Sequence, residues 1–192
     1  MNLPNQLTVL RIFMIPVFVI ILAVPLDWGS LSVGGVTLAV THLVAAIIFA
    51  LASITDWLDG KIARSRGLVT NFGKFADPLA DKMLVMSAFI MLVALDKAPA
   101  WVVAVIVCRE LAITGLRLLL VEDGEVMAAA WPGKVKTATQ MLAIILLLIQ
   151  NIPFALFNVP LDQIMLYVCL IATVYSGVDY FVKNSHVFKG SM

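Results

Sequence analysis

The chain has 192 residues, of which 62% are hydrophobic and only 13% are charged, and its mean hydropathy is +1.04. A globular domain of this size cannot hide so much apolar surface, so the composition excludes an ordinary water-soluble fold and indicates an integral membrane protein. The net charge is +1 and no basic run is present, so nothing points to a nucleic-acid partner.

Six apolar segments follow one another along the chain, each long enough to cross a hydrocarbon core of about 30 Å as a helix. They are continuous rather than alternating with period two, which favours helices over the strands of a membrane barrel. We therefore predict an all-α integral membrane fold with six transmembrane helices in a single domain, residues 1–192. The predicted spans are residues 8–26, 36–55, 78–95, 99–121, 136–152 and 161–182.

The N-terminal residues carry polar side chains at a regular spacing. Asn5, Thr8 and Arg11 recur every three residues after Pro4. The pattern predicts a short amphipathic N-terminal segment at the membrane interface, with membrane anchoring preferred over a role in substrate binding. No small-residue cleavage site follows, so we expect this segment to be retained.

The basic residues indicate how the spans are oriented. Of 13 Lys and Arg residues, 12 lie on or toward one side of the six-span arrangement, and Lys97 alone lies on the other. The connections at 27–35 and 153–160 carry no basic residue. By the positive-inside rule, the sequence predicts a multi-pass protein of the cytoplasmic membrane with both termini on the cytoplasmic side.

Four aspartates lie where the second span leads into the third, between residues 56 and 81. Asp56 and Asp59 are three residues apart, and Asp77 and Asp81 are four apart, so each pair shares one face of a helix. Pro78 is expected in the first turn of the second of these helices. The turn-forming residues between the pairs are Gly67, Asn71 and Gly73. Two helix ends at the cytoplasmic edge can thus direct their carboxylates into a shared space.

Such a cluster of carboxylates calls for a bound cation. Four carboxylates near a low-dielectric boundary cannot all stay ionised without compensation. Their oxygens suit Mg²⁺ or Mn²⁺, and no His or Cys is near enough to indicate zinc. We predict two divalent ions, an arrangement that holds phosphoryl oxygens during a displacement. The alternative is a solvated loop, but the helical spacing argues against it, as do the small residues Gly60, Ala63 and Gly73.

The acidic stretch resembles the signature of the CDP-alcohol phosphatidyltransferases. It reads D-x-x-D-G-x-x-A-R, eight residues, then G-x-x-x-D-x-x-x-D, with every fixed position of that pattern present between residues 56 and 81. The resemblance implies a six-span homodimer with a cytoplasmic active site, in which Asp81 is the general base that deprotonates an attacking alcohol. The implied ligands of the two Mg²⁺ or Mn²⁺ ions are Asp56, Asp59, Asp77 and Asp81. The implied CDP-lipid site consists of Gly60, Ala63, Arg64 and Gly73.

Charged residues in the fourth and fifth spans are candidates for the acceptor site. Charges near the middle of a span are costly and by default functional, which singles out Arg109 and Glu110. We predict that Arg109, Arg117 and Lys134 bind the phosphate of a phosphorylated alcohol, because buried phosphate calls for Arg and Lys donors. Alternatively, such residues form an interhelical ion pair or reach up to the head-group layer.

Three further segments narrow the resemblance. "NLPNQLTVLR", "RELAITGLR" and "GKVKTATQ" are similar to segments of the branch of the family that makes phosphatidylglycerophosphate. The implied reaction joins CDP-diacylglycerol and sn-glycerol 3-phosphate and releases CMP. Inositol phosphate, serine or a phospholipid stay open as other acceptors. A divalent-cation transporter would also explain the aspartates, but it leaves Arg64, Arg109 and Lys134 without a reason, since cations raise the barrier of a metal pathway.

Overall fold

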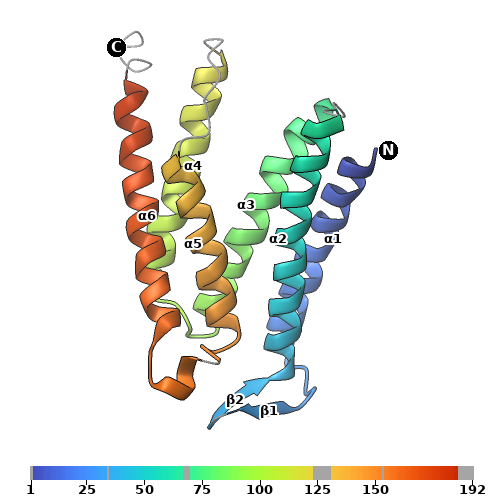
Figure 1. Ribbon diagram of the computed structural model, residues 1–192, viewed down its shortest axis with the longest axis vertical. Coiled ribbons are helices and arrows are strands. Elements are labelled where there is room, and N and C mark those ends of the chain that lie inside the picture. Colours follow the sequence, from blue (N-terminus) through green and yellow to red (C-terminus); the bar gives the residue numbers. More distant parts are fainter. Residues whose placement is uncertain (1, 34, 67–69, 123–130, 153, 186–192) are drawn as a thin grey trace.

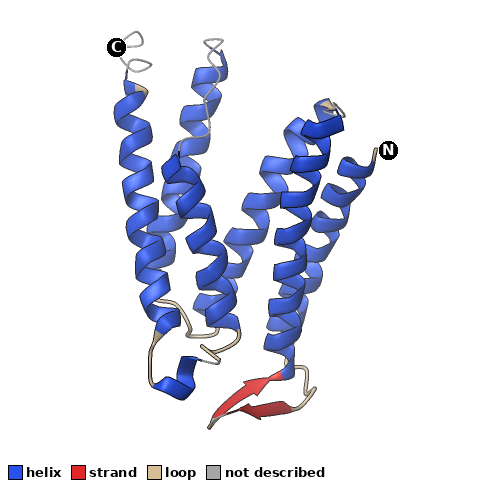
Figure 2. Ribbon diagram, viewed as in Figure 1, coloured by secondary structure: helices blue, strands red, loops and turns tan. Residues whose placement is uncertain are grey.

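The computed structural model describes residues 2–33, 35–66, 70–122, 131–152 and 154–185. In this part of the chain, six long helices form a bundle with a two-stranded hairpin at one end (Figures 1 and 2). The helices are α1 (Leu3–Ala23), α2 (Val40–Arg66), α3 (Asn71–Ala94), α4 (Ala100–Glu122), α5 (Trp131–Leu148) and α6 (Leu161–Lys183). The strands are β1 (Ser30–Val33) and β2 (Val36–Ala39), and a short 3-10 helix, η1, covers Phe154–Phe157.

A long helix covers most of each of the six predicted spans, but the hairpin is an unpredicted element. Residues 36–39, which we expected to begin the second span, form β2 instead. The β-branched residues Val36 and Thr37 favour a strand, and Gly35 has a φ of +84°, which only glycine adopts readily. The two strands are antiparallel and pair Ser30 with Ala39, Leu31 with Leu38, Ser32 with Thr37, and Val33 with Val36.

The helices also differ from the prediction at their ends. α1 runs without a break from Leu3, so the expected N-terminal interfacial segment is the first part of a long helix and not a separate element. α5 ends at Leu148, before the predicted end of the fifth span, because Gln150 and Asn151 adopt left-handed φ values of 55° and 61°. These changes move the boundaries of the helices and leave their order as predicted.

The link between α2 and α3 is shorter than the sequence suggested. The hydroxyl of Thr70 accepts a hydrogen bond of 3.0 Å from the backbone N–H of Gly73 and caps α3, which then begins at Asn71. Pro78 therefore lies inside α3 and not in its first turn, where we had placed it. As a result, a stretch expected to turn is helical, and the third helix reaches farther toward the end of the bundle that lies opposite the hairpin.

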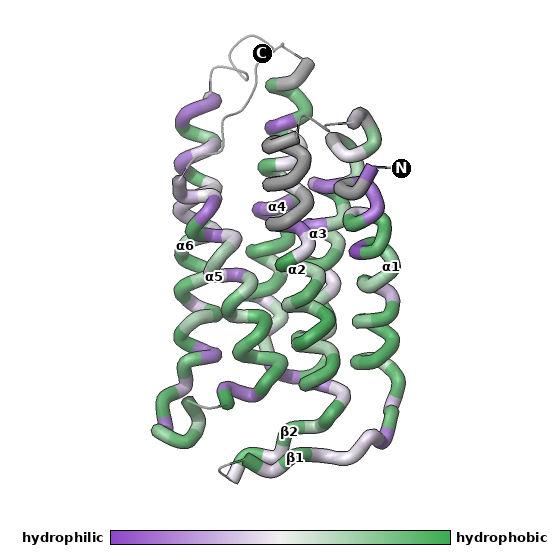
Figure 3. Tube along the Cα trace, turned by 45° about the vertical axis from the view of Figure 1, so that its right-hand side comes forward, coloured by the Kyte–Doolittle hydropathy of each residue, from purple (hydrophilic) through white to green (hydrophobic). Residues whose placement is uncertain are grey.

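Among the residues that the structure describes, two helical segments are long and apolar enough to cross a membrane by length and composition alone, Asn5–Ala23 in α1 and Leu161–Lys183 in α6. Val40–Asp56 in α2 is apolar but shorter. Figure 3 shows that apolar residues dominate the middle of the bundle and the half near the hairpin, whereas polar residues gather on the helices at the opposite end. The bundle thus has one apolar half and one half in which charged side chains are frequent.

The buried core occupies the half of the bundle near the hairpin. It draws on the second halves of α1, α3 and α5 and on the first halves of α2, α4 and α6. Phe18 of α1 and Phe49 of α2, whose ring centroids are 6.2 Å apart, are fully buried within it, as is Phe89 of α3. This packing fixes the helices at one end and leaves the other end, where α1 begins and α6 ends, for polar side chains (Figure 1).

Candidate active site

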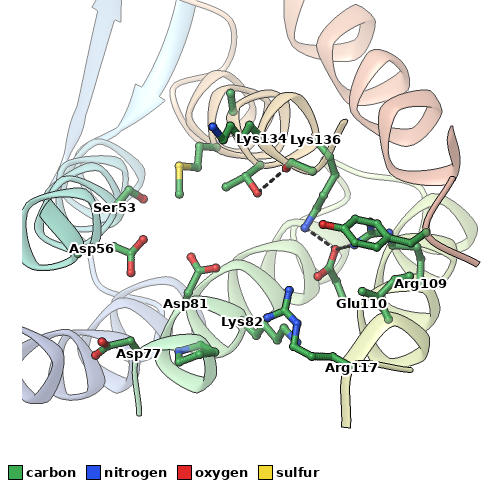
Figure 4. Close-up of a pocket in the computed structure, with 18 residues that line it drawn as sticks. Ser53, Asp56, Asp77, Asp81, Lys82, Arg109, Glu110, Arg117, Lys134 and Lys136 are labelled. Carbon is green, nitrogen blue, oxygen red and sulfur yellow. Dashed lines mark hydrogen bonds and ion pairs between the residues drawn. The ribbon is translucent and has the colours of Figure 1, made fainter. Parts of the chain in front are cut away.

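A cavity of about 660 Å³ opens among α2, α3, α4, α5 and α6 in the polar half of the bundle. Its charged lining comes from helices that are far apart in the sequence, and the two signs lie apart in space (Figure 4). The carboxylates on one side are Asp56, Asp77 and Asp81. The cationic side chains on the other side are Lys82, Arg109, Arg117, Lys134 and Lys136, with Glu110 among them.

On the acidic side, the structure brings together three of the four predicted aspartates. Asp56 of α2 and Asp81 of α3 direct their carboxylates toward one another across the cavity, and Asp77 turns its carboxylate toward α1 (Figure 4). The side chain of Asp59 lies outside the described residues, although its backbone belongs to α2. Two helix ends therefore point carboxylates into one space, which is the arrangement that their sequence spacing suggested.

The polar stripe of α1 packs against this acidic side. The Nη1 of Arg11 donates to Oδ1 of Asp56 at 2.6 Å, and the Oγ1 of Thr8 donates to Oδ1 of Asp77 at 2.5 Å. Both Arg11 and Thr8 are fully buried. The stripe therefore faces the carboxylates inside the protein, and anchoring of the N-terminal segment at the membrane interface stays a prediction. On a helix whose other faces are apolar, polar residues every three positions form one face, and here that face meets the carboxylates.

The donor atoms on the acidic side are oxygens alone. Oxygen donors fit hard divalent cations such as Mg²⁺ or Mn²⁺, so the lining fits the predicted metal chemically. Among the side chains that the structure describes, no group of three or more Asp, Glu, His or Cys is placed to hold a metal ion. Asp56, Asp77 and Asp81 thus line one cavity without forming such a group by themselves, and the side chain of Asp59 lies outside the described residues.

The residues predicted to bind the CDP-lipid differ in their position relative to the cavity. Gly60 lines the cavity, whereas Gly73 is buried beside it and is not a lining residue. A Cβ on Gly73 would lie 3.4 Å from Oδ2 of Asp77, so the backbone of α3 comes close to this carboxylate. The side chains of Ala63 and Arg64 lie outside the described residues.

On the cationic side, the three predicted acceptor residues Arg109, Arg117 and Lys134 all line the cavity, and the structure adds Lys136. Lys136 is buried, at 8% exposure, whereas Lys134 is exposed. The sequence nonetheless carries a signal for Lys136. The buried residues of α5 include Lys136, Gln140, Ala143, Ile144 and Leu147, so Lys136 begins the inward face of that helix.

Glu110 joins two of the cations. Its Oε1 lies 2.5 Å from Nζ of Lys136, on the neighbouring helix, and 3.3 Å from Nη1 of Arg109. Arg109 also donates to Oγ of Ser176 at 2.5 Å, and its guanidinium lies over the ring of Tyr180, 5.9 Å from the centroid. The alternative of an interhelical ion pair therefore holds for Glu110 and Lys136. Both members of this pair face the cavity, so the pair does not remove them from it.

Lys82 connects the two sides of the cavity. It follows Asp81 on α3, and its Nζ donates to the hydroxyl of Thr114 on α4. That hydroxyl in turn donates to the backbone carbonyl of Glu110 at 2.6 Å. These hydrogen bonds tie α3, which carries Asp77 and Asp81, to α4, which carries Arg109 and Arg117. They therefore help to set the distance between the acidic side and the cationic side, which we call the cationic wall.

Comparison with known proteins identifies the family of this chain. The family profile of the CDP-alcohol phosphatidyltransferases matches residues 1–175. The CDP-diacylglycerol--glycerol-3-phosphate 3-phosphatidyltransferase of Bacillus subtilis is 53% identical over 190 residues, which cover 99% of this chain and 98% of that protein. The probable phosphatidylglycerophosphate synthase of Mycobacterium tuberculosis is 40% identical over 95% of this chain and 81% of its own length. The CDP-diacylglycerol--glycerol-3-phosphate 3-phosphatidyltransferase of Pseudomonas fluorescens is 36% identical over 94% of this chain and 88% of its own length.

These matches extend far beyond the short acidic motif. They cover the α1 stripe, the acidic stretch and both helices of the cationic wall. A match of this length to transferases overturns the alternative of a cation transporter. The protein is an enzyme, and it belongs to the CDP-alcohol phosphatidyltransferase family.

Proposed function

We propose that this protein transfers the phosphatidyl group of CDP-diacylglycerol to sn-glycerol 3-phosphate, giving phosphatidylglycerophosphate and CMP. The observation that carries the proposal is that three aspartates and five cationic side chains line one and the same cavity. A diphosphate donor calls for divalent cations on carboxylates, and a phosphorylated acceptor calls for Lys and Arg. The names of the relatives that match over most of their length state the same donor and acceptor.

The acidic side is assigned to the donor. Asp56, Asp59, Asp77 and Asp81 would hold two Mg²⁺ or Mn²⁺ ions, and these ions would neutralise the donor's diphosphate and so favour displacement at phosphorus. Gly60, at the cavity wall, leaves room for the nucleotide beside Asp56. Gly73, Ala63 and Arg64 complete the CDP-lipid site in this proposal.

Asp81 is the proposed general base. Its carboxylate stands between the acidic and the cationic sides of the cavity (Figure 4), within reach of an acceptor held on the cationic side. It takes the proton from the 1-hydroxyl of glycerol 3-phosphate, and the oxygen forms a bond to the phosphorus that bears diacylglycerol. The bond from that phosphorus to the CMP oxygen breaks, and CMP leaves with the electron pair.

The cationic wall is assigned to the acceptor's phosphate. Arg109, Arg117 and Lys134 supply donors along one side of the cavity, and Lys136 adds a fourth cation. Glu110 fixes Lys136 and Arg109, so the wall is ordered before the phosphate arrives. A neutral acceptor such as serine would leave this concentration of positive charge without a use.

We further propose a topology of six membrane spans with both termini and the cavity on the cytoplasmic side. α1 begins and α6 ends at the cavity end of the bundle (Figure 1), while Lys97 lies in the loop between α3 and α4 at the other end. This agrees with the uneven distribution of basic residues. A homodimer remains a prediction from the family resemblance.

A direct assay tests the function. Purified protein in detergent is mixed with CDP-diacylglycerol and Mg²⁺ or Mn²⁺, and CMP release is measured with glycerol 3-phosphate, inositol phosphate, serine or phosphatidylglycerol as acceptor. We expect release with glycerol 3-phosphate and none after chelation of the metal. If another alcohol supports release and glycerol 3-phosphate does not, the acceptor is misassigned.

A further inference from the structure

The first helix carries a cation and a hydroxyl into the acidic site, although none of its described side chains lines the cavity. Arg11 is fully buried and contacts Asp56 at 2.6 Å, and Asp56 itself keeps 31% of its side chain exposed toward the cavity. Thr8, one turn earlier, contacts Asp77 at 2.5 Å. The hydroxyl of Thr70 donates to Asn5 at 2.9 Å, which fastens the start of α1 to the start of α3.

A buried arginine at this place has a specific electrostatic consequence. Taking a guanidinium out of water costs several kcal/mol, and only close pairing with anions offsets that cost. Asp56, Asp77 and Asp81 line one cavity, so in the absence of a divalent cation their charges repel one another. The charge of Arg11 lies next to one of them and lowers that repulsion whether or not a metal is bound.

We propose that Arg11 is a built-in counter-cation that keeps the acidic site assembled without metal, and that Thr8 is a positioning residue that orients Asp77 within it. The inference rests on the proposed metal site on Asp56, Asp77 and Asp81. It gives α1 a role in preparing that site. Neither residue touches the reacting atoms, so both act through the aspartates.

The counter-cation role predicts an unusual dependence on metal. A fixed positive charge stabilises the metal-free site but repels an incoming cation. Removing that charge therefore destabilises the metal-free protein and at the same time strengthens metal binding. An arginine that only fills space would, on removal, destabilise the protein equally with and without metal.

The test compares Arg11→Gln with Arg11→Lys, two shorter side chains that differ in charge. Thermal unfolding of the full-length protein in detergent is followed as Mn²⁺ is added without substrate. For Arg11→Gln we expect a lower unfolding temperature without metal and a Mn²⁺ midpoint at least about tenfold below that of the wild type. Arg11→Lys is expected to keep the wild-type midpoint. Equal destabilisation of both variants, unaffected by Mn²⁺, would overturn the proposal, as would failure of both variants to fold.

Thr8→Val is expected to shift the Mn²⁺ midpoint in the opposite direction from Arg11→Gln. Valine has a similar shape but cannot donate to Asp77, so this carboxylate loses its orientation and we expect the Mn²⁺ midpoint to rise about threefold. Thr41→Val, near the hairpin end of α2, is the matched control and is expected to leave the midpoint unchanged. An unchanged midpoint in Thr8→Val would remove its positioning role.

A separate control tells failure of this inference from failure of the proposed function. Asp56→Asn and Asp77→Asn are expected to abolish stabilisation by Mn²⁺. If the wild type itself gains no stability from Mn²⁺ and releases no CMP with glycerol 3-phosphate, both the function and the counter-cation role fall. If the wild type behaves as expected and only the two Arg11 variants do not, the inference on Arg11 is wrong and the proposed function is unaffected.

Discussion

The two sides of the cavity carry opposite charges, and each is held by a residue of the other sign. Among the carboxylates, the buried Arg11 pairs with Asp56 at 2.6 Å. Among the cations, Glu110 lies 2.5 Å from Lys136 and also contacts Arg109. In both cases the counter-charge comes from a different helix than its main partner. A site that binds two anionic substrates thus keeps its own charges partly compensated before either substrate arrives.

The two sides differ in how their residues are distributed along the chain. The acidic side is built from two helix ends joined by a short link, so its members lie within residues 56–81. The cationic side is assembled from α4 and α5, which both pack against α3 and α6, and the ion pair between Glu110 and Lys136 joins these two helices. The acidic side is therefore a local feature of the sequence, and the cationic side is a tertiary one.

The largest effect is expected from Asp81→Asn, which tests the chemistry assigned to the acidic side. An amide cannot accept the proton of the acceptor hydroxyl, so we expect CMP release to fall about 100-fold to 10,000-fold. Binding of CDP-diacylglycerol in the presence of Mn²⁺ is expected to persist. Both are measured on purified protein, the first with saturating glycerol 3-phosphate.

The matched control for this variant is Asp96→Asn, in the loop at the far end of the bundle. Asp96 has a φ of 55°, a conformation that asparagine adopts readily, so this change removes a charge without straining the backbone. We expect wild-type turnover. Full activity of Asp81→Asn would take the role of base away from Asp81.

Much of the acidic side could be predicted from the sequence, because helical spacing alone places Asp56 and Asp59, and Asp77 and Asp81, on shared faces. The partners of these carboxylates could not be predicted as reliably. The α1 stripe was visible as a spacing of three, but on a helix near a membrane the same pattern describes an interfacial anchor. Only the packing of α1 on α2 and α3 shows that Arg11 points inward.

The fold shows the same limit. Apolar runs predicted six long helices and their order, because a long apolar run leaves few alternatives to a helix. They did not predict the hairpin at 30–39 or the start of α3 at Asn71, since those depend on short stretches, a glycine with positive φ and the Thr70 cap. On the cationic side, Lys134 and Lys136 looked equivalent until the buried face of α5 separated them.

The second prediction tests the cationic side through Glu110→Gln. Lys136 and Glu110 are both buried, with side-chain exposures of 10% and 8%, so removing the carboxylate leaves a buried ammonium without its counter-charge. We expect a loss of about 3 kcal/mol or more in unfolding free energy. The double variant Glu110→Gln with Lys136→Met should recover most of this loss.

Asp179→Asn provides the comparison, because it breaks an exposed ion pair with Lys183, whose side chain is 61% exposed. Water and salt screen such pairs, so a small change is expected. Similar losses in Glu110→Gln and Asp179→Asn would contradict the view that Glu110 holds the cationic wall together.

A smaller effect is expected from Lys134→Ala, which leaves the wall intact but removes one exposed cation from the cavity lining. A charged hydrogen bond is worth about 1.5–3 kcal/mol, so we expect the KM for glycerol 3-phosphate to rise about tenfold. The KM for CDP-diacylglycerol is expected to stay the same. Lys97→Ala, at the opposite end of the bundle, is the control. If Lys134→Ala changes neither KM, the acceptor pocket is misplaced.

The smallest effect on turnover is expected from Gly73→Ala, which tests the placement of Asp77 separately from the stability of α3. A Cβ on Gly73 would lie 3.3 Å from Oδ1 of Asn5 and 3.4 Å from Oδ2 of Asp77, so Gly73→Ala forces a shift of a few tenths of an ångström. Since a misplacement of about 1 Å costs about 100-fold in rate, such a shift should lower turnover about threefold. Gly115→Ala, on α4, meets nothing within 4 Å and is expected to keep full turnover. Because alanine favours a helix at both positions, a drop in turnover without a drop in unfolding temperature for Gly73→Ala would show that placement of Asp77, and not folding of α3, limits the reaction.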